Sequence, residues 1–305
     1  MNGDIFKMVE KRYKDDFDKL KDKRFHFASR LFLWTNDEFA KNKLAELKSE
    51  YIGTSEDEHL VKIATILKED IDNKNILFRK EREKFLIKYP LLKKYNKILF
   101  KNLFCETIYG IDLKKVIDEK IKEDEFVKLR NDLLADKEAI AILSTHAINY
   151  FYTLDFYLKE GRTFFDPLSF IDIVANNEKS TASLRVYLLT HCIIGESAFY
   201  ARYIRRDRKS YEKILLKIES IIESNYESIS LDNKVEFLVC AKLCQKKSYL
   251  EKRIFSDVES AFDSDCRYFV EKGKTKNNRS FKKGEHRNVL ALMAFYYEKK
   301  VGGNA

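Results

Sequence analysis

Apolar residues recur every three or four positions near the start of the chain, at Ile5, Val9, Tyr13, Phe17 and Leu20. This spacing places them on one face of an α-helix, because an α-helix completes a turn every 3.6 residues. Similar periodicity continues almost to the C-terminus. It predicts a chain of helices joined by short turns, near residues 4–22, 24–34, 36–50, 56–71, 75–88, 90–107, 112–124, 125–134, 137–159, 167–176, 181–206, 210–224, 233–246, 248–255, 257–271 and 285–299.

Capping residues fix several of these helix starts. A hydroxyl or amide side chain at the N-cap can accept a hydrogen bond from the backbone N–H three residues later. A Glu at that later position can accept one from the backbone N–H of the N-cap residue. We therefore expect helices to begin near residues 36, 56, 233 and 257. The residues that carry this pattern are Thr35 with Glu38, Ser55 with Glu58, Asn233 with Glu236, and Ser256 with Glu259.

Three histidines stand at the start of similar sequence segments, and each is followed by an apolar stretch that ends in aromatic residues. They are His146, His191 and His286; the first two lie 45 residues apart, and the third lies 95 residues further on. This period is typical of stacked helical hairpins. It predicts a helical region at 1–110 followed by a hairpin-repeat region at 111–305, with a soft boundary between them.

The composition supports the same fold class. Nine glycines and two prolines in 305 residues are too few for the many tight turns of a β-sandwich or for glycine-rich nucleotide loops. Hydrophobic residues make up 45% of the chain, enough for a large core. We predict an all-α protein of repeated antiparallel helical hairpins, stacked as a solenoid or closed into a ring as an α/α toroid.

The sequence predicts a cytoplasmic location and no membrane partner. It contains neither a secretory signal pattern nor an apolar stretch long enough to span a bilayer. Its five cysteines are an odd number at irregular spacing, which favours reduced thiols over a disulfide framework. Cys240 and Cys244 could share a metal, but the sequence offers no matching second pair, and we expect both to be buried core residues.

The helix predicted at 181–206 contains the strongest functional candidates. Glu196 lies in an otherwise apolar run, and a buried carboxylate needs a partner or a shifted pKa. Gly195 and Ala198 leave room for a second helix or a ligand near His191. In a ring-closed fold, His146, His191 and His286 would share one cavity with Glu196 and act in acid–base catalysis or bind a metal. We expect no cofactor, and a metal only if these histidines ligate it.

The net charge of +9 is concentrated toward the two ends of the chain. Basic clusters of this kind can neutralise the phosphates of a nucleic acid, although they also occur on ordinary solvated surfaces. The candidate residues for anion binding in the last third are Arg202, Arg205, Arg206, Arg208, Lys276, Arg279, Lys282 and Lys283.

These features predict one principal function and two alternatives. The principal prediction is an intracellular helical-repeat scaffold that binds a protein or peptide partner. The first alternative is an α/α-toroid enzyme of the hydrolase, lyase or cyclase type, with the histidine-lined cavity as its active site. The second is a nucleic-acid-binding helical protein.

Overall fold

The computed structural model describes residues 3–69, 79–159, 164–271 and 279–297. Their secondary structure is almost entirely α-helical, with one 3₁₀ helix and one short β-hairpin. The predicted all-α class is therefore confirmed. The capped start at Ser55 is also confirmed, because its side chain accepts a hydrogen bond from the backbone N–H of Glu58.

The chain divides into two compact units. The terminal unit combines the two ends of the chain, Met1–Leu47 and Ile222–Ala305, and the central unit is Lys48–Ile221. The chain passes from one unit to the other twice, within α3 (Glu38–Tyr51) and within α13 (Arg208–Ser224). The predicted boundary near residue 110 lies inside the central unit, and the division into 1–110 and 111–305 stays a prediction.

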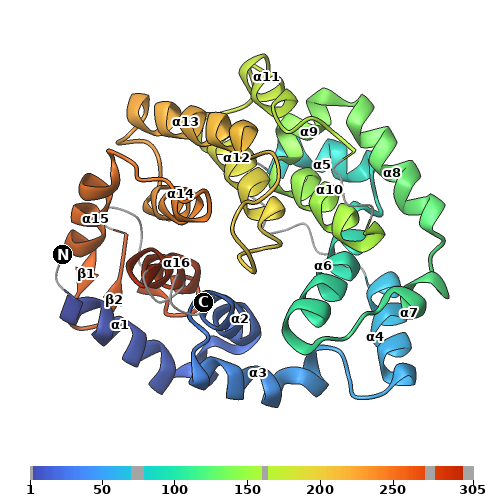
Figure 1. Ribbon diagram of the computed structural model, residues 1–305, viewed down its shortest axis with the longest axis horizontal. Helices are drawn as coiled ribbons and strands as arrows, with labels where there is room; N and C mark the ends of the chain where they lie inside the picture. Colours follow the sequence, from blue (N-terminus) through green and yellow to red (C-terminus); the bar gives the residue numbers. More distant parts are fainter. Residues whose placement is uncertain (1–2, 70–78, 160–163, 272–278, 298–305) are drawn as a thin grey trace. The chain divides into compact units, whose positions relative to one another are not determined.

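In the terminal unit, α16 is buried along most of its length. It packs against α14, α2 and α1, and Figure 1 shows α14, α16 and α2 beside one another with α15 and α1 outside them. Aromatic stacking joins α1 to α16, because the ring centroids of Phe6 and Phe295 lie 4.3 Å apart. The elements of this unit are α1 (Gly3–Asp15), η1 (Phe17–Lys23), α2 (Arg24–Thr35), α14 (Leu231–Leu243), α15 (Glu251–Ser260), β1 (Phe262–Asp263), β2 (Tyr268–Phe269) and α16 (Glu285–Phe295).

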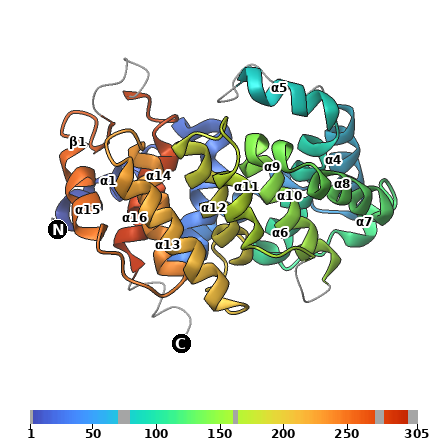
Figure 2. The same ribbon diagram turned by 90° about the horizontal axis from the view of Figure 1, so that it is seen from above.

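In the central unit, α10 packs against both α6 and α12 (Figure 1). Figure 2 shows α5 at the edge of this unit next to α4. Gly195 allows a close approach of α12 to α10, because a Cβ at this position would lie 2.4 Å from the ring of Tyr152. The remaining elements are α4 (Glu56–Lys68), α5 (Arg79–Lys88), α6 (Leu92–Tyr109), α7 (Lys114–Asp118), α8 (Glu123–Ala135), α9 (Lys137–Leu143), α10 (Thr145–Leu158), α11 (Ser169–Ala175) and α12 (Ala182–Glu196).

Two long predicted helices are interrupted. The helix predicted at 137–159 is two helices, because Ser144 has a φ of 51° and its hydroxyl donates to the carbonyl of Leu184. The helix predicted at 181–206 ends at Glu196, because three consecutive residues, Ala198, Phe199 and Tyr200, have positive φ. Left-handed backbone at consecutive non-glycine residues cannot continue a right-handed helix.

The helix predicted at 257–271 is wrong. Ser256 lies inside α15, so it caps nothing, and the chain then turns through the hairpin of β1 and β2. Asp263 stabilises this turn, because its carboxylate accepts hydrogen bonds from the backbone N–H groups of Asp265 and Cys266.

Two other predicted caps are displaced. Asp37 caps α3 by accepting from the N–H of Ala40, whereas the hydroxyl of Thr35 donates back to the carbonyl of Leu31. Ser230 caps α14 instead of Asn233.

Candidate active site

Helix α16 begins with four polar residues, Glu285 to Asn288, and all but His286 are buried in the core of the terminal unit. The last two fasten the hairpin. Asn288 accepts from the N–H of Phe269 at 2.8 Å and donates to its carbonyl at 3.1 Å. Arg287 forms ion pairs with Asp232 at 3.2 Å and Glu271 at 3.4 Å. Arg287 and Asn288 therefore have a structural role.

Glu285 pairs with His26, the third residue of α2. The Nδ1 of His26 lies 2.7 Å from the Oε1 of Glu285. The imidazole is 23% exposed, whereas the carboxyl group is fully buried behind it. The second oxygen of Glu285, Oε2, is buried and has no hydrogen-bond partner among the described residues. This contact orients the His26 ring through Nδ1, so Nε2 is the ring nitrogen outside the pair.

A second pair lies beside the first. The Nε2 of His286 is 3.6 Å from the Oε2 of Glu236, on α14, and again the imidazole is partly exposed at 33% while the carboxylate is buried at 1%. The rings of His26 and His286 have their centroids 5.7 Å apart and planes inclined by 45°. We call His26, Glu236, Glu285 and His286 the His–Glu cluster.

Burial shifts the proton equilibria of the first pair. It raises the pKa of Glu285 from 4.5 to about 7, although the positive charges of Arg30 and Lys23 oppose this shift. Burial, with the same two charges, holds the pKa of His26 well below its usual value of 6.5. The imidazole of His26 is therefore neutral at physiological pH, and Glu285 exchanges a proton near neutrality. Shifts of this size in a cluster of titratable groups are typical of active sites.

The sequence identified only one member of this cluster as a candidate. His286 belonged to the repeated segments and Glu236 was assigned to a helix cap, whereas no sequence pattern singled out His26. Glu236 did carry a usable signal, because it stands in the same kind of apolar run as Glu196, followed by Phe237, Leu238 and Val239.

The central unit places the other predicted residues differently. The Nδ1 of His191 lies 2.6 Å from the Oδ1 of Asn149, on α10, one turn after His146. Glu196 is engaged elsewhere: Arg206 donates to both of its carboxylate oxygens, at 2.9 and 3.0 Å. His146 and His191 thus share the region where α10 meets α12, while Glu196 is held by Arg206. His286 belongs to the other unit.

The three histidines also differ in their helical positions. His146 and His286 are each the second residue of a helix, whereas His191 lies near the C-terminal end of α12. The repeated phrases therefore do not occupy equivalent places in their helices.

Several of the predicted anion-binding residues have acidic or backbone partners. Arg202 donates to the carbonyl of Glu196, Arg279 pairs with Asp263 at 3.1 Å, and Lys282 pairs with Asp22. Arg205, Arg208 and Lys283 are exposed. Lys276 lies outside the described residues.

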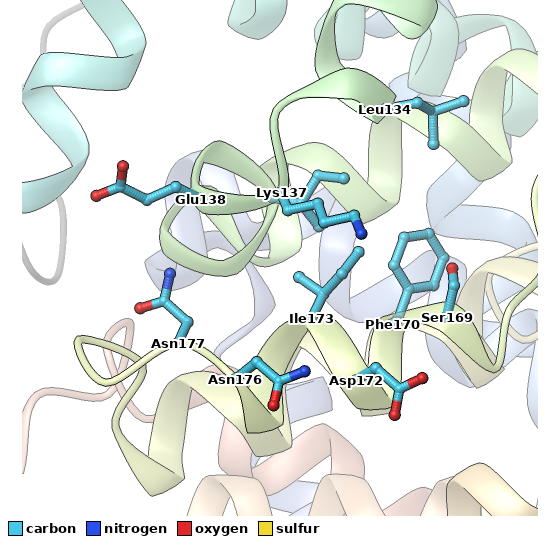
Figure 3. Close-up of a pocket in the computed structure, with 10 residues that line it drawn as sticks. Leu134, Lys137, Glu138, Ser169, Phe170, Asp172, Ile173, Asn176 and Asn177 are labelled. Carbon is cyan, nitrogen blue, oxygen red and sulfur yellow. The ribbon is translucent and has the colours of Figure 1, made fainter.

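A pocket of about 430 Å³ lies near α9 and α11 of the central unit. Figure 3 shows Lys137 on one side of it and Ser169, Phe170, Asp172 and Asn176 along the α11 side. Glu138 at its rim is paired with Lys179 at 2.9 Å. Its lining contains no histidine or cysteine.

In the parts of the chain that the structure describes, no group of three or more His, Cys, Asp or Glu residues could hold a metal ion; ligation by His146, His191 and His286 stays a prediction. All five cysteines are free. Among the described helices, none has the length and apolarity required to cross a bilayer.

Comparisons with protein-family models, with curated proteins and with solved structures gave no match to this chain.

Proposed function

We propose that this chain is an enzyme that uses general acid–base catalysis at the His–Glu cluster. The observation that carries the proposal is the repeated arrangement of a partly exposed imidazole in front of a buried carboxylate, with the two rings 5.7 Å apart. A buried carboxylate orients an imidazole and stabilises the charge that it acquires on taking a proton. Two such rings at this separation can act on the same substrate group.

The two histidines have different roles in this proposal. His26 is the general base, because its pKa lies below the usual value and its Nδ1 is held by Glu285, which leaves Nε2 for the proton. His286 is the general acid, because the carboxylate of Glu236 stabilises a positive charge on its ring. Glu285 and Glu236 are positioning residues.

The charges around the first pair favour an anionic substrate. Lys23 and Arg30 both act electrostatically on His26 and Glu285. Together with the net charge of +9, they favour a phosphodiester. The substrate class that suits a base and an acid without a protein nucleophile is RNA, which carries its own nucleophile, the 2′-hydroxyl.

The proton balance of this reaction uses both histidines. His26 takes the proton of the 2′-hydroxyl as its oxygen attacks the phosphorus, and the bond from phosphorus to the 5′-oxygen breaks. His286 gives a proton to that leaving oxygen. The products are a 2′,3′-cyclic phosphate and a free 5′-hydroxyl, and water restores the original protonation of the two rings by proton exchange.

The test is cleavage of a fluorogenic single-stranded RNA, with DNA of the same sequence as the substrate control. His26→Ala and His286→Ala should each lower kcat by about 100-fold or more, since each removes a general acid or base. His59→Gln, in the central unit, is the matched histidine control and should retain activity. Wild-type protein that leaves RNA intact, or cleavage that survives in both alanine variants, would refute the proposal.

The scaffold function and the solenoid or toroid arrangement of hairpins stay predictions of the sequence. The packing of α10 against α6 and α12 is compatible with antiparallel hairpins in the central unit, and a binding partner would have to be found by direct assay.

A further inference from the structure

The pocket of about 430 Å³ near α9 and α11 has a partly apolar lining (Figure 3). Two of its lining residues, Ile140 on α9 and Phe170 on α11, are fully buried, and two more, Leu134 and Ile173, are half-buried. The volume lies in the range of cavities that hold small molecules, and apolar side chains make up much of the lining in such cavities. This pocket is therefore large enough for a ligand that buries an apolar group.

Two charged side chains of opposite sign line this pocket. Lys137 stands on one side of it, and Asp172 stands on the α11 side (Figure 3). Both are exposed, and within the described parts of the chain neither side chain has an ion-pair or hydrogen-bond partner. Glu138 also lines the pocket, but Lys179 pairs with it at 2.9 Å. The pocket thus offers a ligand one ammonium group and one carboxylate that other side chains leave unpaired.

Neutral polar side chains of the same lining are held in place by local hydrogen bonds. The hydroxyl of Ser169 donates to the carbonyl of Asp166 at 2.6 Å, so its oxygen can accept from a ligand. The Oδ1 of Asn177 accepts from the backbone N–H of Lys179 at 3.0 Å, which leaves its amide nitrogen as a donor. Groups that are oriented before a ligand arrives bind it with a smaller loss of entropy.

We propose that this pocket binds a zwitterion with an apolar side chain, supplied as an α-amino acid or as a short peptide. The carboxylate of the ligand pairs with Lys137, its ammonium group pairs with Asp172, and its side chain lies against Phe170. A ligand without charges would cover Lys137 and Asp172 and supply no partner to either, which costs free energy. The pocket belongs to the central unit, and the proposal is independent of the His–Glu cluster and of the reaction proposed there.

The test is isothermal titration calorimetry with L-leucine and with L-leucyl-L-leucine, and the tighter of the two distinguishes a free amino acid from a peptide. The tighter ligand is then compared with its N-acetylated form, which lacks the ammonium group, and with its amidated form, which lacks the carboxylate. Each should bind about tenfold more weakly, as expected for the loss of one charge-assisted hydrogen bond. The form with glycine in place of leucine should also bind about tenfold more weakly, because it buries no apolar side chain.

Two variants assign the charges of the ligand to residues. Asp172→Asn should weaken the tighter ligand by about tenfold but leave the affinity of the N-acetylated form unchanged, because that form has no ammonium group. Lys137→Gln should weaken the same ligand by about tenfold but leave the affinity of the amidated form unchanged. A variant that merely disturbed the fold would weaken every ligand equally.

Lys128→Gln is the matched control. Lys128 is an exposed lysine of α8 that pairs with Asp132 at 2.7 Å and lines a different pocket, so its loss should leave the affinity for the zwitterion unchanged. No binding of either ligand at about 10 mM would overturn the proposal. Equal affinities for the charged, N-acetylated and amidated forms, or equal weakening by Lys128→Gln and Lys137→Gln, would overturn it as well.

Discussion

In the terminal unit, His26 and His286 each face a buried carboxylate, whereas in the central unit His191 faces an amide and His146 lies near two cations. All four imidazoles stand on helices and all are partly exposed. What separates them is the charge on the neighbouring helix. A carboxylate behind an imidazole suits it for the proton transfer that we propose, whereas the groups beside His146 and His191 are cations and an amide, which give no such support to a protonated ring.

The largest expected effect is that of Glu285→Gln, which keeps the shape of the side chain and removes its charge. Activity should fall by about 100-fold or more, because His26 loses the carboxylate that stabilises its protonated form. The pH–rate profile should lose the limb that Glu285 controls near pH 7. Unchanged kcat with an unchanged profile would remove Glu285 from the mechanism.

The same variant should be more stable than wild type at alkaline pH. The unfolded carboxyl group releases its proton near pH 4.5, but the folded one keeps it to about pH 7. The contribution of the protonated form to stability is therefore fully present below pH 4.5 and lost as the pH rises through about 7. Above that pH, Glu285→Gln should raise the free energy of unfolding by on the order of 3 kcal/mol. Chemical denaturation at pH 5 and pH 8 measures this difference, which should be small at the lower pH.

Asn288→Ala tests the structural role of the polar residues that follow His286 in α16. It removes the side chain that accepts from the buried N–H of Phe269 and donates to its carbonyl, which keeps only the donor of Arg287 among these side chains. The free energy of unfolding should fall by about 3 kcal/mol, while kcat of the folded protein stays near wild type. A loss of activity larger than the loss of folded protein would show that Asn288 serves catalysis as well as stability.

The sequence predicted much of this fold because helix formation depends on neighbouring residues. The period of apolar positions located most helices, and Ser55 with Glu58 identified the start of α4. Interruptions were missed where tertiary contacts impose them, as at Ser144, whose hydroxyl bonds to a residue 40 positions away. The hairpin after α15 was missed because Asp263 forms a turn within a sequence that also has helical periodicity.

The candidate site was less predictable than the fold. His26 and Glu285 are 259 residues apart, so no local pattern joins them. Glu196 was correctly singled out as a carboxylate that needs a partner, and that partner is Arg206, ten residues along the chain. Sequence reasoning found residues that require explanation, but it could not assign their partners.

Gly195→Ala tests whether the central unit depends on close helix packing. The new methyl group would overlap the base of the Tyr152 ring, a part of the side chain that cannot easily move. We expect a loss of about 2 kcal/mol in the free energy of unfolding. The histidine resonances of the terminal unit should keep their positions; a shift at His26 would show that the two histidine environments are coupled.

Arg205→Glu should have the smallest effect on stability, below about 0.5 kcal/mol, because Arg205 is exposed. If the basic segment binds RNA, this variant should weaken binding and flatten its salt dependence. Arg206→Glu is not an equivalent test, because it leaves Glu196 buried without its charged partner. RNA binding that is insensitive to Arg205→Glu would exclude this residue from the interface.

The most direct test of the central comparison is an NMR pH titration that follows the side-chain carboxyl carbon of Glu285 and the imidazoles of His26, His146 and His191. We predict that Glu285 titrates near pH 7, because the effect of burial outweighs that of the neighbouring positive charges. We also predict that the pKa of His26 lies well below 6.5, because burial and the charges of Arg30 and Lys23 all lower it. If Glu285 titrated near pH 4.5 and His26 near 6.5, burial would not shift the proton equilibria of this pair, and its proposed role in proton transfer would be contradicted.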